Sequence, residues 1–371
     1  MTLRGRVLDT IRATAPVSRV EVAAATGLAQ ASVTAAVKEL LAAGYVKETG
    51  RGASTGGRPR TLLSLNPGGA YALGAQLGWH RSTTVLADLT GAVVASADGE
   101  GAGSRPPEEI VAGLAKDVRR LRRRAHGPVL GLGLAVPGPI DAPHGTAVQL
   151  PSAAPWADFS LTGALGAATG LPVFLDNDAT AAAVGEHWAG AAPGGVLALV
   201  YMERGIGAGI VDSGVPFRGG SGNAGEIGHI SVDLTGDECT CGSRGCVELF
   251  AAPAATERRY REATGRSATH AEITTAAAEG DPPAVAVVDA AAAALAAAVV
   301  SFANVVDPDQ IVIAGPGFAH ATDRYVDAIQ RRLDATAFVR RTHPVVVRAA
   351  SESHLTAPLG AAALVLHDLV M

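Results

Sequence analysis

The sequence predicts a small α+β domain followed by a larger α/β body, and three observations lead to this prediction. The first 65 residues place short helical segments ahead of two strand-like segments. From Ala70 onward, strand-like and helical segments alternate with glycine-rich turns, which is the pattern of an α/β fold. At 371 residues, the chain is also longer than most single domains. We therefore expect one domain at residues 1–65 and a second at residues 66–371.

Composition and charge limit the class of protein. Apolar residues make up 48% of the chain, which favours a globular protein over a disordered one. Residues 1–60 hold nine Lys or Arg against four Asp or Glu, a balance of +5, so the remaining residues carry −10 of the total of −5. A basic head on an acidic body is typical of a phosphate-binding module joined to another kind of domain, although chance clustering is the alternative.

The first domain has the local signals of a helix-turn-helix. A helical pattern over Val7–Ala13 stops before Pro16, and Ser18 with Glu21 three residues later forms a capping box for the next helix. That helix ends at Gly27, and another follows over 30–43 until Gly44. Helix, glycine-containing turn and helix are the order of a DNA-reading motif.

A hairpin completes a winged helix-turn-helix. Strands are expected at 45–48 and 61–65, with a glycine-rich loop between them. On the second helix of the motif, Val33, Val37, Leu40 and Leu41 are expected to face the core. The candidate contacts to duplex DNA are the outward residues of that helix and the arginines of the loop: Gln30, Ser32, Thr34, Lys38, Arg58 and Arg60. The alternative interpretation is an ordinary three-helix unit with a solvated basic loop.

The body reads as an α/β domain. The expected loop at 98–107 separates a pair of strands from a helix, and the apolar stretch 284–306 is expected to be a buried, alanine-rich helix rather than a membrane span. The absence of a basic-then-apolar leader favours a cytoplasmic protein. The expected strands are 71–77, 82–88, 129–136, 173–175, 196–201 and 310–314, and the expected helices include 108–124 and 179–188.

Two carboxylates lie at a strand-to-helix junction, in the segment Asp176-Asn177-Asp178. In one interpretation, Asp176 or Asp178 caps the following helix. In the other, the segment sits at the carboxyl end of a parallel strand, where open α/β sheets bind ligands. The segment alone leaves both open.

The pattern His229-x9-Cys239-x-Cys241-x4-Cys246 contains every cysteine of the chain. Three thiolates and one imidazole form a closed tetrahedral zinc site with no position for a catalytic water. Buried free thiols or a redox pair are the alternatives. We therefore expect structural Zn²⁺ on His229, Cys239, Cys241 and Cys246.

These motifs together resemble the ROK family (repressor, open reading frame, kinase), and in particular its regulators with a DNA-binding head. The resemblance covers nearly the whole chain. It rests on the winged-helix residues and on three segments of the body: 134–141 (LAVPGPID), 225–229 (GEIGH) and 239–248 with its three cysteines and Glu248.

The resemblance implies a two-lobed, actin-like sugar-kinase fold that binds a sugar in its cleft. It implies a small lobe at about 70–180 together with the carboxyl-terminal helix, and a large, zinc-containing lobe at about 181–355. The sugar-binding residues that it implies are Asn177, Asp178, Glu226, His229 and Glu248.

The chain departs from the kinases that it resembles at both phosphate loops. Their first loop, an Asp followed by Gly-Gly-Thr-Lys, corresponds here to Gln76 and then Gly78–Arg81. Their second loop, Gly-Thr-Gly-Ile-Gly, corresponds here to 203–207 (ERGIG). Because phosphoryl transfer depends on positioning and charge stabilisation, we expect no enzyme activity.

The leading hypothesis is a sugar-responsive transcriptional repressor that binds operator DNA and a sugar or sugar-phosphate effector, as a homodimer or homotetramer. The alternative is an ATP-dependent sugar kinase with a fused DNA-binding head. A third hypothesis is a DNA-binding protein whose sensor domain binds no ligand.

Overall fold

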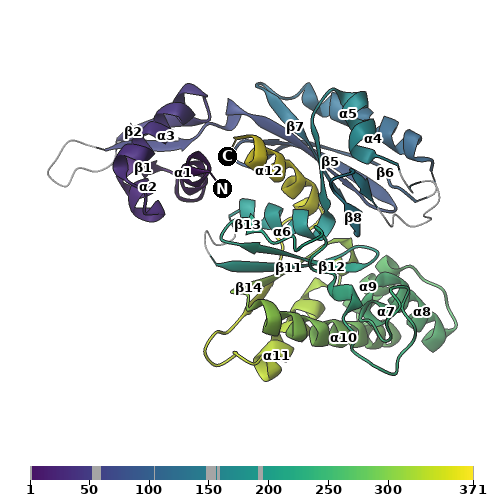
Figure 1. Cartoon of the computed structure of the whole chain (residues 1–371). Helices are drawn as coiled ribbons and strands as arrows, with labels where there is room; N and C mark the ends of the chain where they lie inside the picture. The colour runs from purple at the N-terminus through teal and green to yellow at the C-terminus, as the bar shows by residue number, and fades with distance from the viewer. Residues whose placement is uncertain are drawn as a thin grey trace.

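The computed structural model describes residues 2–51, 60–103, 105–147, 156, 159–190 and 195–370, with backbone alone at 368–370. Three sheets of three or more strands divide the described chain. We call the part with the three-stranded sheet the head (residues 2–65), and the parts with the two five-stranded sheets the small lobe (about 70–180) and the large lobe (about 181–355). Figure 1 shows the head at one end of the molecule and the two lobes beyond it.

The head is a winged helix-turn-helix. Ser18 Oγ accepts a hydrogen bond from the backbone N–H of Glu21, whose carboxylate accepts one from the N–H of Ser18, so the predicted capping box is present. Gly27 ends the following helix with a φ of 68°. The elements are α1 (Leu3–Thr14), β1 (Val17–Ser18), α2 (Arg19–Thr26), α3 (Gln30–Ala42), β2 (Val46–Arg51) and β3 (Thr61–Leu65).

The core of the head follows the predicted pattern with one difference. Val33, Val37 and Leu40 are buried, whereas Leu41 is half-buried at the edge of this core. Strand β1 was missed by the sequence analysis because it has only two residues. It pairs with β3 and extends the hairpin to a sheet of order β1-β3-β2.

The small lobe is a mixed sheet whose central strands, β4, β5 and β7, are largely buried on both faces. Its strand order is β10-β7-β4-β5-β6, with β4, β7 and β10 parallel to one another. Alternate residues of β4 belong to different cores, Ala72 to the one that includes α6 and α12 and Leu73 to the one that includes α4. The elements are η1 (Pro67–Gly69), β4 (Tyr71–Leu77), β5 (Arg81–Asp88), β6 (Val93–Glu100), α4 (Pro107–Arg122), β7 (Val129–Val136), β8 (Ile140–Asp141), β9 (Thr146–Ala147), α5 (Leu161–Thr169) and β10 (Val173–Asn177).

The predicted loop at 98–107 is wrong at its start. Residues 98–100 belong to β6, where Glu100 pairs with Arg81 across the antiparallel ladder. This edge strand is polar and exposed on one face, so it lacks the apolar pattern that marks a buried strand.

The large lobe has the sheet order β13-β12-β11-β14-β15. One face of β11 joins the core around α10 and the other face joins the core around α6 and α12. The elements are β11 (Val196–Met202), β12 (Ile206–Asp212), β13 (Val215–Pro216), η2 (Ile227–His229), α7 (Glu248–Ala251), α8 (Pro253–Thr264), α9 (His270–Ala278), α10 (Pro282–Val306), β14 (Gln310–Ala314), η3 (Pro316–Phe318), α11 (Thr322–Thr336) and β15 (Val346–Ala349).

The predicted alanine-rich helix is α10. By length and composition it could cross a membrane, as could α2 and α3 taken as one bent span. Eleven residues of α10, including Leu295 and Phe302, are buried in the core of the large lobe against neighbouring helices. Helix α10 is therefore a core element of this fold, as the sequence predicted.

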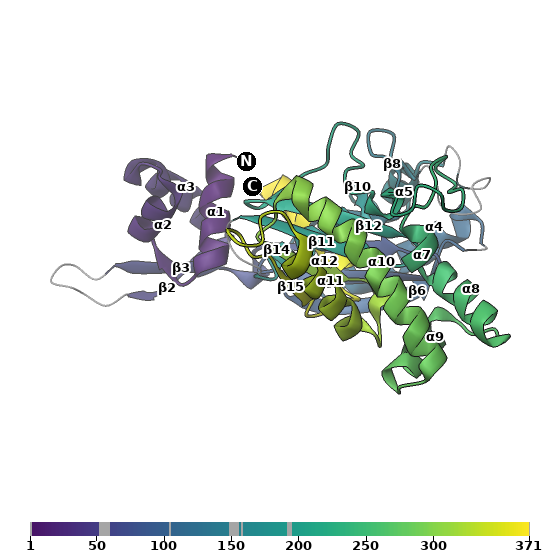
Figure 2. The same cartoon turned by 90° about the horizontal axis from the view of Figure 1, so that it is seen from below.

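Two helices lie between the sheets of the two lobes, α6 (Asp178–Trp188) and α12 (Thr356–Val370). All eleven residues of α6 are buried. The helices cross at glycines, because a Cβ on Gly360 would lie 1.6 Å from Ala181 O and a Cβ on Gly185 would lie 2.2 Å from Thr356 O. Figures 1 and 2 both show the carboxyl end of α12 beside α1 of the head.

Candidate functional site

A cleft of about 730 Å³ lies between the two lobes. Its lining comes from the turns after β4 and β7, the junction of β10 and α6, the turn between β11 and β12, η2, the cysteine-containing loop, and α7 and α8. All five sugar-binding residues expected from the resemblance line this cleft, namely Asn177, Asp178, Glu226, His229 and Glu248.

The junction of β10 and α6 supplies two of these residues. Asn177 is the N-cap of α6, and its Oδ1 accepts hydrogen bonds from the N–H groups of Ala179 (2.9 Å) and Thr180 (3.1 Å). Of the two interpretations left open by the sequence, the one in which Asp176 or Asp178 is the N-cap is therefore wrong, because the amide oxygen of Asn177 takes that position.

Asp178 lies at the floor of the cleft with 7% of its surface exposed. Burial raises its pKa well above the ordinary range, and the nearby carboxylate of Glu203 raises it further. A carboxyl group in this state is protonated more readily than a solvated one, so it can donate a hydrogen bond to a ligand oxygen.

Glu226 and Glu248 come from the opposite wall. An atom placed at the Cβ position of Gly138 would lie 2.7 Å from Glu226 Oε1 and 2.9 Å from Asn177 Nδ2, so these two side chains converge on one point of the cleft. Glu248 begins α7, and its Oε1 accepts a hydrogen bond from the N–H of Ile206 at 3.1 Å.

The four residues of the predicted metal motif come together. His229 Nδ1 lies 3.5 Å from Cys239 Sγ, and Cys241 Sγ lies 3.6 Å from Cys246 Sγ. All four candidate ligand atoms lie within 4.8 Å of one another. A tetrahedral zinc ion with ordinary bond lengths would separate its ligand atoms by about 3.6–3.8 Å, so the donor set and its spacing fit a metal ion such as Zn²⁺.

The cleft also contains residues of the two segments that the resemblance matched to the phosphate loops of kinases. Glu203 Oε1 accepts a hydrogen bond from the N–H of Trp79 at 3.2 Å, and the guanidinium carbon of Arg204 lies 4.5 Å from the centre of the Trp79 ring. Burial raises the pKa of Glu203. Gln76 donates from Nε2 to the hydroxyl of Tyr201 at 2.6 Å. The sequence analysis identified these positions but not their contacts, which join segments more than 120 residues apart.

The candidate DNA contacts lie on the surface of the head where they are described. Gln30, Thr34 and Lys38 are exposed on α3, and Arg60 is exposed just before β3. Ser32 is half-buried on the same helix, and Arg58 lies outside the described residues.

The head contacts the body through Arg12, which the sequence analysis missed. Arg12 donates to Asp9 Oδ1 (2.9 Å) and to the backbone oxygen of Trp188 (2.7 Å), and its Nη2 lies 3.5 Å from His187 Nε2. Its guanidinium carbon also lies 4.8 Å from the centre of the Trp188 ring. Burial and the charge of Arg12 lower the pKa of His187. No local pattern marks this contact, because the partners of Arg12 in the body lie about 175 residues away.

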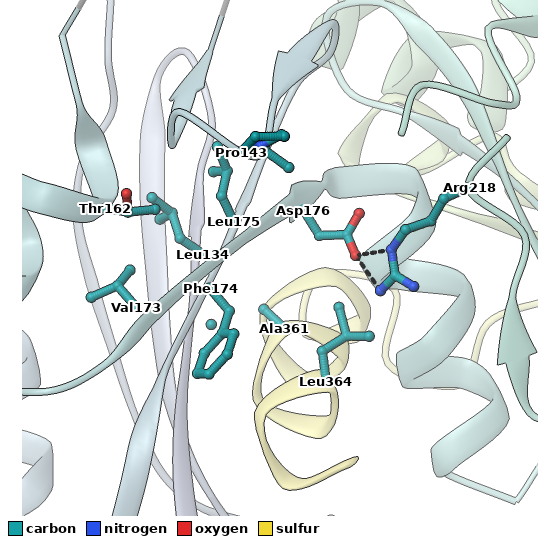
Figure 3. Close-up of a pocket in the computed structure, with 12 residues that line it drawn as sticks. Leu134, Pro143, Thr162, Val173, Phe174, Leu175, Asp176, Arg218, Ala361 and Leu364 are labelled. Atoms are coloured by element: carbon teal, nitrogen blue, oxygen red, sulfur yellow. Dashed lines mark hydrogen bonds and ion pairs between the residues drawn. The ribbon is translucent and has the colours of Figure 1, made fainter. Parts of the chain in front are cut away.

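A second cavity of about 390 Å³ lies between β10 and α12 (Figure 3). Its two charged lining residues are paired with each other: Arg218 donates to Asp176 Oδ2 from Nε at 3.0 Å and from Nη2 at 2.7 Å. This ion pair joins the two lobes behind the main cleft, and it leaves the cavity without a free charge for a ligand.

Two family patterns match the chain. The pattern of the ROK family matches residues 72–368, and the pattern of winged helix-turn-helix DNA-binding domains matches residues 2–47. Among individual proteins, the chain is 28% identical over 383 residues to the xylose repressor of Caldicellulosiruptor bescii, covering 98% of this chain and 95% of that protein. It is 31% identical to the DNA-binding transcriptional dual regulator NagC of Escherichia coli, covering 94% and 88%.

Solved structures show the same relationship. A ROK family transcriptional regulator described as a homologue of the Escherichia coli MLC protein matches with a TM-score of 0.78 and 26% identity, covering 98% of this chain and 96% of that one. A ROK family glucokinase from Streptomyces griseus, solved with glucose and AMPPNP, matches with a TM-score of 0.68 and 26% identity. The glucokinase covers 79% of this chain, compared with 98% for the regulator.

Proposed function

The chain belongs to the ROK family, and on that premise we propose that it is a sugar-responsive transcriptional repressor. The observation that carries the proposal is that α6 connects the cleft to the DNA-binding head. One end of this helix lies in the cleft at Asp178, and the other end contacts Arg12 of the DNA-binding head. Its relatives include a xylose repressor and an N-acetylglucosamine repressor, both of which match nearly the whole chain.

The head binds operator DNA in this proposal. Helix α3 enters the major groove, with Gln30, Ser32 and Thr34 near base edges and Lys38 near phosphates. Arg58 and Arg60 of the wing contact the adjacent minor groove. As a homodimer or homotetramer, the protein reads two half-sites separated by roughly 10 base pairs or a multiple of that.

The cleft binds the sugar. Asn177, Glu226 and Glu248 supply polar groups for sugar hydroxyls, and Asp178 faces the hydroxyl that a kinase would phosphorylate. This arrangement is supported by the convergence of Asn177 and Glu226 on Gly138 from opposite walls of the cleft. We propose domain limits of 1–65 and 66–371, so that the sugar site lies wholly within the second domain, and a cytoplasmic place of action.

Zinc holds the wall that carries Glu226 and Glu248. His229, Cys239, Cys241 and Cys246 bind it, and the closed ligand set gives it a structural role. Elemental analysis of the purified protein tests this assignment: about one zinc per chain is expected, and Cys241→Ser should lose it. Wild-type protein that is folded and free of metal would contradict it.

We propose that the chain does not transfer phosphate. The contacts of Glu203 with Trp79 and of Gln76 with Tyr201 support this view, because they engage residues of the two segments that the resemblance matches to the phosphate loops of kinases. The alternative, a sugar kinase with a DNA-binding head, is favoured by Asp178 at the cleft floor. An assay of ADP release with hexoses, pentoses and amino sugars separates the two, since sustained turnover is expected only from a kinase.

A binding experiment tests the function as a whole. The protein's own upstream DNA is footprinted with and without each sugar of a panel that includes D-xylose, D-glucose and N-acetyl-D-glucosamine. Protection of a site with two half-sites, released by one of the sugars, is expected. Protection that no sugar or sugar phosphate changes would leave a DNA-binding protein without a sensor, and the proposal would then be wrong.

A further inference from the structure

At each of three glycine-rich turns of the two lobes, one backbone N–H group already has an acceptor within the chain. The turn after β4 donates from Trp79 N to Glu203 Oε1 at 3.2 Å. The turn after β11 donates from Ile206 N to Glu248 Oε1 at 3.1 Å. The turn after β14 donates from Gly315 N to Ser353 Oγ at 2.7 Å. Such turns bind phosphate through free N–H groups, and here oxygens of the chain itself occupy these donors.

The amino end of α6 is occupied in the same way. The N–H groups of Ala179 and Thr180 in the first turn have no backbone partner within the helix, and both donate to Asn177 Oδ1. Ala179 N also lies 2.8 Å from Asp178 Oδ1. A helix terminus attracts anions through unpaired N–H groups and its dipole. Here an anion would have to displace the side chains of Asn177 and Asp178, the residues that face the sugar.

The side chains of the cleft also disfavour a second anion. Four acidic residues line it, namely Asp178, Glu203, Glu226 and Glu248, compared with two arginines. Arg204 covers the Trp79 ring, and Arg258 donates to the backbone oxygen of Leu249 at 3.0 Å. A phosphate group in the cleft would therefore meet more acidic than basic side chains.

We propose that the effector of this protein is an uncharged sugar, and that Glu203 is the residue that excludes the phosphate ester of that sugar. This inference rests on the proposed sugar site, because Asp178 must face the hydroxyl that the ester would carry. The hydrogen bond to Trp79 holds the Glu203 carboxylate in the space beyond that hydroxyl. Glu203 is therefore a specificity-determining residue.

Calorimetric titration of the full chain tests the inference with pairs of compounds. The pairs are D-glucose with glucose 6-phosphate and N-acetyl-D-glucosamine with its 6-phosphate, and D-xylose and inorganic phosphate are titrated alone. The wild type is expected to bind one free sugar at least about tenfold more tightly than its ester. Glu203→Gln keeps an acceptor for Trp79 N while removing the charge, so it should lower that preference by about tenfold. Glu108→Gln, an exposed change of the same charge on α4, should leave the preference unchanged.

The outcomes separate this inference from the proposed function. A phosphate ester that binds the wild type more tightly than its parent sugar would overturn the inference and leave the sensor function intact. Equal changes in Glu203→Gln and Glu108→Gln would overturn the role of Glu203. If no compound binds in the titration, the proposed sensor function is wrong, and this inference is wrong with it.

Discussion

Helix α6 meets the rest of the molecule in two different ways at its two ends. At its amino end, Asn177 and Asp178 face an open cleft of about 730 Å³. At its carboxyl end, His187 and Trp188 contact Arg12, whose side chain is only 6% exposed. The amino end, which we call the open end, therefore presents polar groups to a space that a ligand can fill. The carboxyl end, which we call the closed end, is already covered by the Arg12 side chain of the head.

This difference suggests how a ligand could affect the head. A buried helix that packs against α12 through glycines has little freedom to bend, so a shift at one end is transmitted to the other. We propose that ligand binding at the amino end shifts α6, and that the contact of its carboxyl end with Arg12 passes this shift to α1. Four substitutions, on α6 and at its contacts with α12, α1 and its own N-cap, test the comparison.

The largest effect is expected where α6 crosses α12. Gly360→Ala should lower the free energy of unfolding by about 1–3 kcal/mol, because the new Cβ would lie 1.6 Å from Ala181 O and the helices must separate. Gly113→Ala, on the exposed face of α4 with nothing within 4 Å of its Cβ position, should raise it by about 0.5–1 kcal/mol. Chemical denaturation measures both. A neutral Gly360→Ala would mean that this crossing is not tight.

Arg12→Ala removes the contact at the closed end. Loss of this contact should lower the free energy of unfolding by about 1–3 kcal/mol, because the backbone oxygen of Trp188 and the ring nitrogen of His187 lose a buried hydrogen-bond partner. Operator binding should persist, but sugar should no longer release it. Arg6→Ala, on the same helix but bonded to Thr26 within the head, serves as the control in an electrophoretic mobility assay. A full sugar response in Arg12→Ala would exclude this contact from the regulatory route.

Asn177→Ala acts at the open end. It removes the N-cap of α6, so the free energy of unfolding is expected to fall by about 1 kcal/mol. Sugar affinity is expected to fall as well. Ser160→Ala removes the N-cap of α5 and should cost a similar amount without changing sugar binding. Asn177→Asp keeps a capping oxygen and should retain stability better than it retains affinity. Thermal unfolding and calorimetry distinguish the two effects.

The smallest effect concerns pH at the closed end. Because burial and Arg12 lower the pKa of His187, the unfolded chain takes up this proton at a higher pH than the folded one does. The stabilising contribution of His187 is therefore complete above its unfolded pKa of about 6.5 and is lost as the pH falls below that value. His187→Gln should flatten the loss of stability between pH 7.5 and 5.5 by less than about 1 kcal/mol. The exposed His354→Gln is the control, and equal slopes in both variants would contradict the prediction.

Local patterns were enough to predict many elements and the metal cluster. The capping box of Ser18 and Glu21 lies within four residues, and the cysteines lie within eight, so neighbouring side chains decide both features. The helix α10 was also predicted, because an apolar stretch of this length has few other soluble arrangements. The edge strand β6 was missed, since its exposed face carries polar residues that read as a loop.

The sequence by itself predicted the order of the elements, the capping box of the head and the cluster of His229, Cys239, Cys241 and Cys246, and the family resemblance added five residues that line the cleft. The capping box and the cysteine cluster depend on residue type and short-range spacing. Only the tertiary structure decided that Glu203 accepts the N–H of Trp79, that Asn177 rather than a neighbouring aspartate caps α6, and that Arg12 docks on Trp188. The contacts of Glu203 and Arg12 join residues more than 120 positions apart, and the folded chain chooses such partners through the packing of its sheets and helices.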